Sequence, residues 1–219
     1  MRNQRRFKKS KSRFFSIIEM HIKSNAKEYI IAVLVLIIGI IVGVTMVNTS
    51  SEQNKEEMSG YINEFVESVK KKEYTIDGQK LFMKSAISNL KLAAILWVAG
   101  LTVIGIPVIY VSVGYKGVRI GYSMASIIAT LGKTKGIVFS LSTMFFQNLI
   151  GIPCILAIMV SSVKMYKLMV KNRSRESLKT EVVRHTIFSL IMTSGMLVSA
   201  FFEYVFTISF FCDIIINFV

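Results

Sequence analysis

The sequence predicts an all-α protein, a polytopic membrane helix bundle with five transmembrane helices, and three observations lead to this fold class. First, hydrophobic residues make up 53% of the 219 residues, and the mean hydropathy is +0.54. Second, residues 29–51, 92–115 and 136–163 are runs of 23, 24 and 28 residues without a charged side chain. Each run exceeds the roughly 20 residues with which a helix crosses a bilayer. Third, only two prolines occur, and with this hydrophobicity that excludes a disordered chain or an ordinary soluble domain.

The distribution of Lys and Arg decides how many segments are expected to cross. Residues 120–132 form a shorter uncharged run, and the apolar stretch after His185 is interrupted by Glu203 and Asp213. If both regions cross, 18 Lys and Arg lie on the inner side and nine on the outer side, whereas a re-entrant 120–132 makes the split 13 to 14. Because Lys and Arg of short loops face the cytoplasm, we predict five crossings with the N-terminus inside and the C-terminus outside. The spans are expected near residues 29–48, 92–114, 117–134, 136–163 and 186–205.

This threading divides the chain into a basic cytoplasmic tail, residues 1–28, and a single membrane domain, residues 29–219. Met1 and Met20 both remain open as the native start. Residues 49–91 form an extracytoplasmic loop, in which Asp77 and Gly78 mark the turn of a small extracytoplasmic helical hairpin.

An apolar stripe runs along the first half of this loop, where hydrophobic residues recur every three or four positions. Two interpretations stay open: the stripe packs on the protein's own spans or lipid headgroups, or it docks a partner. For the second interpretation, the candidate docking residues are Tyr61, Glu64 and Phe65.

The few charges near the bilayer have structural explanations at this stage. We expect Arg119 and Lys133, at the two ends of the thin third span, to reach opposite interfaces with their long side chains. Glu203 is expected near the outer face, where accepting a hydrogen bond from a neighbouring loop is favoured over ion coupling.

Pairs of small residues four positions apart predict where helices approach closely. Each such pair forms a ridge of small side chains along its helix. The ridges favour a compact bundle of closely packed spans, and contact between two copies of the chain in a homodimer is the second possibility. The candidate packing residues are Gly39 and Gly43, Gly117 and Gly121, and Gly195 with Ser199.

No catalytic motif is present in the sequence. It contains neither HExxH nor GxSxG, and no span contains paired acids. His21 and His185 lie beside basic residues, with no carboxylate or serine in obvious register. We therefore expect no enzyme activity, no metal and no cofactor. The net charge of +14 is explained by membrane topology, so membrane lipid rather than nucleic acid is the expected contact.

Four stretches resemble the stage II sporulation protein M family of integral membrane proteins: residues 88–91, 114–121, 146–153 and 200–203. The second stretch lacks the asparagine of the family's Asn-Gly-x-x-x-Gly pattern, and in the third the family's His and Glu are replaced. The positions that align with the family's motifs are Asn89, Asn148, Gly151, Pro153 and Glu203.

The resemblance implies a non-catalytic membrane scaffold of endospore-forming bacteria. Such a scaffold recruits peptidoglycan hydrolases, the stage II sporulation proteins D and P, to the septal and engulfing mother-cell membrane while the forespore is engulfed. The alternative is a small-solute permease or transporter subunit, because the spans near Pro107 and Pro153 are interrupted by proline and glycine.

Overall fold

The computed structural model describes residues 20–70, 78–102, 104–170 and 175–218, with the side chains of 69–70, 146, 175–177 and 207–218 left aside. All regular structure in this part of the chain is helical. Residues 20–24 form a short helical segment that ends at a turn. The further helices are α2 (Ala26–Asn48), α3 (Glu52–Lys70), α4 (Gly78–Gly100), α5 (Gly105–Leu131), α6 (Lys133–Val170) and α7 (Arg175–Phe218).

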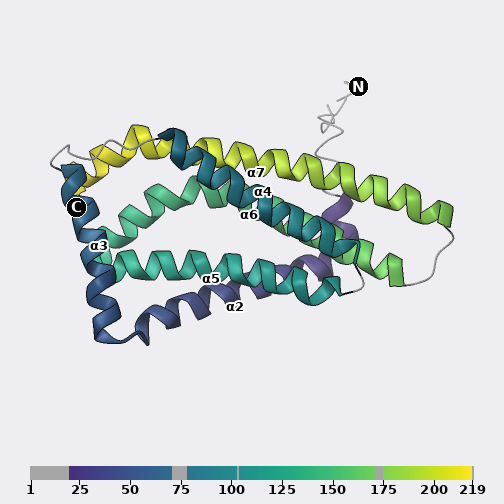
Figure 1. Cartoon of the computed structure of the whole chain (residues 1–219), viewed down its shortest axis with the longest axis horizontal. Helices are drawn as coiled ribbons and strands as arrows, with labels where there is room; N and C mark the ends of the chain where they lie inside the picture. The colour runs from purple at the N-terminus through teal and green to yellow at the C-terminus, as the bar shows by residue number, and fades with distance from the viewer. Residues whose placement is uncertain (1–19, 71–77, 103, 171–174, 219) are drawn as a thin grey trace, which may run out of the picture.

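Five of these helices lie side by side along the long axis of the molecule, and α3 crosses one end of them (Figure 1). Helices α2, α5 and α7 run in one direction, and α4 and α6 run in the other. The N-terminal ends of α2, α5 and α7 and the C-terminal ends of α4 and α6 therefore share one end of the bundle. Helix α3 and the α5–α6 turn share the opposite end, which we call the α3 end. The closest helix pairs are α2 with α5 and α6 with α7.

The bundle is apolar on the outside as well as in its core. Fully buried side chains include Leu96, Ile109, Val113, Ile158 and Met196. Large apolar side chains also lie exposed along the outer faces, among them Ile30, Ile38, Ile41, Val111, Leu149 and Leu190. An exterior of this kind suits lipid rather than water.

Four described helical stretches are long and apolar enough to cross a membrane: Ala26–Asn48, Gly78–Gly100, Gln147–Val170 and Leu178–Phe206. The prediction of an all-helical, multi-pass membrane protein is thereby confirmed. Helix α5 is not among these four, so the fifth crossing and the orientation stay predictions.

The expected second span, residues 92–114, is not one helix. Helix α4 ends at Gly100 and α5 begins at Gly105, so the break falls inside the uncharged run. Here the backbone N–H of Gly105 donates to the carbonyl of Thr102 at 3.1 Å, and a side chain at Gly105 would run into the Ala99 carbonyl. The boundary that the sequence predicted between the second and third spans, at residues 115–116, lies instead within the continuous helix α5. Hydropathy reports burial in lipid, whereas Lys and Arg are good helix formers and do not end a helix.

The expected hairpin over residues 49–91 is also different. Helix α3 is a single helix across the α3 end, and α4 continues from Gly78 directly into the bundle (Figure 1). Asp77 and most of the basic tail lie outside the described residues. The last span is longer than residues 186–205, because α7 continues from Arg175 to Phe218.

Two of the predicted glycine ridges pack against each other. A side chain added at Gly39 or Gly43 of α2 would collide with the backbone of α5. Equally, a side chain at Gly117 or Gly121 of α5 would collide with the backbone of α2 near Leu36 and Ile40. Because only hydrogen occupies these positions, the two helices approach at backbone distance. This contact, which we call the glycine seam, holds α5 in the bundle.

Candidate functional site

A hydrogen-bonded cluster joins three helices inside the bundle. Ser85 of α4 donates its hydroxyl proton to the Oε2 atom of Glu203 on α7. The same hydroxyl oxygen accepts a hydrogen bond from the Nε2 atom of Gln147 on α6 at 3.0 Å. The carboxylate of Glu203 is half-buried. Glu203 was expected to bond a neighbouring loop near the outer face, but its partner is a helix residue that lies 118 positions away.

Further hydrogen bonds extend this cluster through the positions of the family motifs. The Nδ2 atom of Asn89, which is 4% exposed, donates to the carbonyl of Met196 on α7 at 3.1 Å. The hydroxyl of Ser199 donates to the carbonyl of Gln147 at 3.1 Å. Ser199 lies against Gly151, where a side chain would meet it. The structure thus brings Asn89, Gly151 and Glu203 together at the contact of α4, α6 and α7.

The two remaining motif positions lie in α6. Asn148 lines the cavity described next, and its Nδ2 atom donates to the carbonyl of Met144 at 3.0 Å. Pro153 lies inside α6 with an exposed side chain, outside the cluster. On the neighbouring helix, Gly195 packs on Cys154, whose Sγ atom would lie 2.7 Å from an added Cβ. The predicted ridge formed by Gly195 and Ser199 therefore packs on α6.

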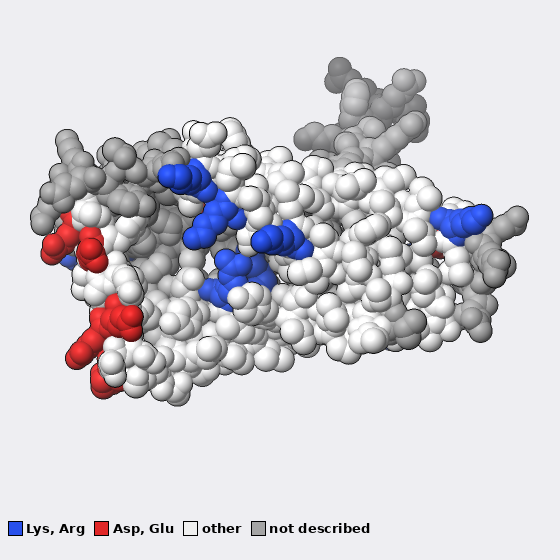
Figure 2. Space-filling view, viewed as in Figure 1, with Lys and Arg blue, Asp and Glu red and all other residues white. Residues whose placement is uncertain are grey.

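The cluster borders a polar cavity of about 370 Å³ between α4, α5, α6 and α7, which we call the central cavity. Its charged lining residues are Lys84, Lys116, Arg119 and Glu203, and its other polar lining residues are Ser85, Ser88, Asn89, Ser123, Gln147 and Asn148. Figure 2 shows Lys and Arg side chains gathered around an opening on this face, while acidic side chains lie over the α3 end. The cavity is therefore positively charged and opens on the side of the bundle.

The two charged residues of α5, Lys116 and Arg119, lie elsewhere than the sequence predicted. Arg119 was expected at a membrane interface, but it lies in the interior of α5 and its Nη1 atom donates to the hydroxyl of Ser88 at 3.2 Å. Lys116 stands one turn away, half-buried and near enough to Glu203 for an electrostatic interaction. Residues three positions apart share a helix face, so the spacing of Lys116 and Arg119 could have indicated that they lie together. The predicted span boundary between them hid this relationship.

A second pocket, of about 590 Å³, lies between α3 and the bundle. It shares Ser123 and Met144 with the lining of the central cavity, so the two adjoin. Ser59 of α3 donates its hydroxyl to Thr130 of α5 at 3.2 Å. The apolar stripe of α3 faces this pocket and the bundle: Val66 is 5% exposed.

The three candidate docking residues are divided between the two faces of α3. Tyr61 is 68% exposed, although it also borders the second pocket. Glu64 is exposed and Phe65 is half-buried. Among the described side chains of the stripe, Val66 packs on the protein's own helices and Phe65 is half-buried, whereas Tyr61 and Glu64 remain accessible.

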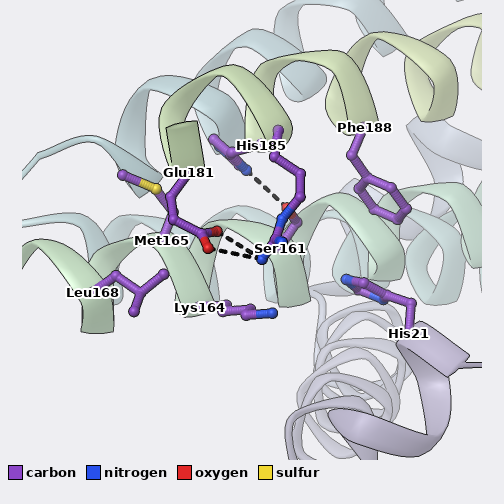
Figure 3. Close-up of a pocket in the computed structure, with 9 residues that line it drawn as sticks. His21, Ser161, Lys164, Met165, Leu168, Glu181, His185 and Phe188 are labelled. Atoms are coloured by element: carbon purple, nitrogen blue, oxygen red, sulfur yellow. Dashed lines mark hydrogen bonds and ion pairs between the residues drawn. The ribbon is translucent and has the colours of Figure 1, made fainter. Parts of the chain in front are cut away.

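The opposite end of the bundle holds a smaller pocket, of about 150 Å³, where the N-terminal segment meets α6 and α7 (Figure 3). The rings of His21 and Phe188 are stacked, with 4.6 Å between their centroids. Burial lowers the pKa of His21 below its usual value, and the positive charges of Lys164 and Arg184 lower it further.

His185, which lines the same pocket, has a serine partner that was not expected. A serine partner was not evident in the sequence, but the Oγ atom of Ser161 lies 2.8 Å from Nδ1 of His185 (Figure 3). The two residues are 8% and 4% exposed. Their hydrogen bond satisfies two buried polar groups and ties α6 to α7. Among the described residues, no three His, Cys, Asp or Glu side chains are close enough to hold a metal ion.

Ser85 and Gln147 are the functional candidates that sequence reasoning missed. Each is an uncharged polar residue in a helix that contains other polar residues. Only the hydrogen bonds that link Ser85 to Glu203, and Gln147 to Ser85, distinguish them from other Ser and Gln residues. Polar side chains that face one another inside a membrane bundle are the exception, and they mark either packing or function.

Comparison with known proteins places this arrangement in a family. No curated protein and no solved structure matches the chain significantly. Residues 32–208 of the 219 match the model of the family described as "Stage II sporulation protein M". This match covers α4, α5 and α6 completely, most of α2 and α7, and every residue of the polar cluster. The chain therefore belongs to the stage II sporulation protein M family of sporulation membrane proteins.

Proposed function

We propose that this protein is a non-catalytic membrane scaffold that recruits peptidoglycan hydrolases, the stage II sporulation proteins D and P, to the septal and engulfing membrane. The family supports a role in sporulation. The observation that carries the scaffold is helix α3. This helix lies across one end of the bundle instead of inside it, and so offers a surface outside the apolar spans (Figure 1).

The direction of the chain supports α5 as a fifth crossing. Helices α4 and α6 run the same way, so if both cross the bilayer, α5 must return the chain through it (Figure 1). Residues 1–28, which lead into α2, and residues 164–184, around the junction of α6 and α7 in the sequence, carry 16 Lys and Arg, against nine in residues 48–91 and 133–135. This bias supports an N-terminus inside and α3 outside, on the side of the cell wall.

The outward surface of α3 is acidic, with one exposed aromatic residue. Its exposed carboxylates are Glu52, Glu56, Glu57, Glu64 and Glu67. Tyr61 projects from the same helix. Aromatic anchors surrounded by charged residues are typical of binding hot spots, and they suit a partner with a basic surface.

The test is capture of the hydrolases by a tagged full-length chain from sporulating cells. Tyr61→Ala combined with Glu64→Lys is expected to abolish capture at an unchanged protein level. Tyr115→Ala is the matched control, because Tyr115 is 63% exposed but lies on α5 away from α3. Wild-type capture by the α3 variant would move the interface into the spans. Loss of capture by the control as well would point to general damage to the bundle.

The central cavity favours a second candidate function, a small-solute permease or transporter subunit. Polar and charged residues inside a membrane bundle usually line a path for a substrate or an ion. Vesicles that contain only this protein test the idea, with flux of small anions as the readout. Flux that disappears in Glu203→Gln would favour the permease, and absence of flux would favour the scaffold.

A further inference from the structure

The central cavity contains more positive than negative charge. Three cations, Lys84, Lys116 and Arg119, line it together with one carboxylate, Glu203. That carboxylate already accepts the hydrogen bond of Ser85. Within the part of the chain that the structure describes, neither Lys84 nor Lys116 forms an ion pair, and the hydrogen-bond partner of Arg119 is a neutral hydroxyl. Glu203 attracts both Lys116 and Arg119, but one carboxylate offsets only one of the three positive charges.

Positive charge in excess of negative charge, in a cavity between helices with apolar outer faces, favours a counter-anion. A cation inside a bilayer is costly unless it is paired or hydrated, because the surroundings have a low dielectric constant. The volume of about 370 Å³ leaves room for a polyatomic anion together with water.

The donors of the cavity suit a phosphate group. The guanidinium of Arg119 offers parallel N–H donors that match two phosphate oxygens, and Lys116 adds a point charge from the same helix face. Ser88, Ser123 and Asn148 supply neutral donors around them.

The surroundings of the cavity indicate how the phosphate arrives. Exposed apolar and aromatic side chains occupy the same helical turns as the cations: Met83 and Ile87 flank Lys84 on α4, while Tyr115 and Tyr122 flank the cations of α5. The opening lies on the side of the bundle (Figure 2). Acyl chains can lie along such a surface while a headgroup enters the cavity.

We propose that the central cavity binds a phosphate group, and that a membrane lipid rather than free phosphate supplies it. Lys116 and Arg119 hold the phosphate, and the hydroxyl and amide groups orient it. The apolar side chains beside the cavity contact the acyl chains. This site is separate from the outward surface of α3, so it stands or falls independently of hydrolase capture.

The experiment uses the full chain, freed of lipid in detergent, with native mass spectrometry as the readout. Three probes are titrated: dioleoylphosphatidylglycerol, dioleoylglycerol with the same acyl chains and no phosphate, and inorganic phosphate. Phosphatidylglycerol is expected to bind at least about tenfold more tightly than dioleoylglycerol, since charge-assisted hydrogen bonds to phosphate are present only in the first complex.

Lys116→Gln and Arg119→Gln are each expected to weaken phosphatidylglycerol binding about tenfold. Lys133→Gln, at an exposed lysine at the start of α6, is the control and leaves binding unchanged. Because Arg119 is exposed, its variant keeps the fold and carries the test even if Lys116→Gln unfolds.

Three results would overturn the proposal. Equal binding of phosphatidylglycerol and dioleoylglycerol would show that the phosphate is not recognised, as would wild-type affinity in Arg119→Gln. Inorganic phosphate that binds as tightly as the lipid and displaces it would assign the cavity to the free anion and remove the lipid from the proposal.

Discussion

Glu203 in the last helix accepts a hydrogen bond from Ser85, which lies 118 residues earlier in α4. Through the same serine, Gln147 of α6 is connected to the carboxylate. Three helices that are distant in sequence are thus joined at one half-buried group. The polar cluster therefore has two consequences at once: it stabilises the packing of α4, α6 and α7, and it forms one wall of the central cavity.

Replacing Glu203 tests the first consequence. Glu203→Ala removes the acceptor of the Ser85 hydroxyl, and the free energy of unfolding is expected to fall by about 1–3 kcal/mol. Glu203→Gln keeps an acceptor oxygen at the same place and should cost less. Unfolding in detergent micelles, followed by circular dichroism, measures both. Glu56→Gln on the exposed face of α3 is the control, and equal losses in all three variants would rule out a specific role of this hydrogen bond.

Two glycine substitutions, one in the glycine seam and one outside it, are expected to change stability in opposite directions. Gly43→Val puts a side chain into the backbone of α5 near Val118, so α2 must move away, with a loss of about 1–3 kcal/mol or more. Gly60→Ala on α3 meets nothing within 4 Å, so the higher helix propensity of alanine should stabilise by about 0.5–1 kcal/mol. Thermal unfolding of the two variants checks both signs. A harmless Gly43→Val would mean that α2 and α5 are not in backbone contact.

Because of His21, we expect the folded chain to become less stable in mild acid. The pKa of His21 in the folded chain lies below its usual value of 6.5, because the side chain is buried beside Lys164 and Arg184. The unfolded chain therefore takes up this proton at a higher pH than the folded chain. Stability is unaffected well above pH 6.5 and is lost as the pH falls through 6.5 towards the folded pKa.

The measurement for His21 is the unfolding temperature at about pH 7.5 and at about pH 5.5. The wild type is expected to lose more stability between these values than His21→Phe, which keeps an aromatic ring against Phe188 but does not titrate. An identical loss in the two proteins would assign the acid sensitivity to other groups.

The direction of α5 predicts which loops an impermeant maleimide reaches in intact cells. Single cysteines are introduced at three exposed positions after Cys154 and Cys212 are replaced. Ser51→Cys, beside α3, is expected to be labelled from outside. Thr102→Cys, between α4 and α5, and Lys179→Cys, near the start of α7, should react only after permeabilisation. Protection of Thr102→Cys together with external labelling of Lys179→Cys would show that α5 does not cross.

The helical membrane class could be predicted from sequence because it depends on local composition. An uncharged run of about 20 residues has few stable options in a bilayer other than a helix, whatever the rest of the chain does. The expected first span, residues 29–48, accordingly differs little from Ala26–Asn48. The small-residue ridges were visible for the same reason, since the spacing of four is written along the chain.

The tertiary structure decided the partners of these residues and the ends of the helices. That Gly43 faces α5, and that Glu203 faces Ser85, are contacts between distant segments which no local pattern contains. The break after Gly100 was hidden because a turn within an apolar run leaves hydropathy unchanged. Composition alone thus determined that the chain lives in a membrane as a set of helices. Where Lys116, Arg119 and Glu203 gather was decided only by helix packing, since charge placement in space depends on which helix faces are turned towards each other.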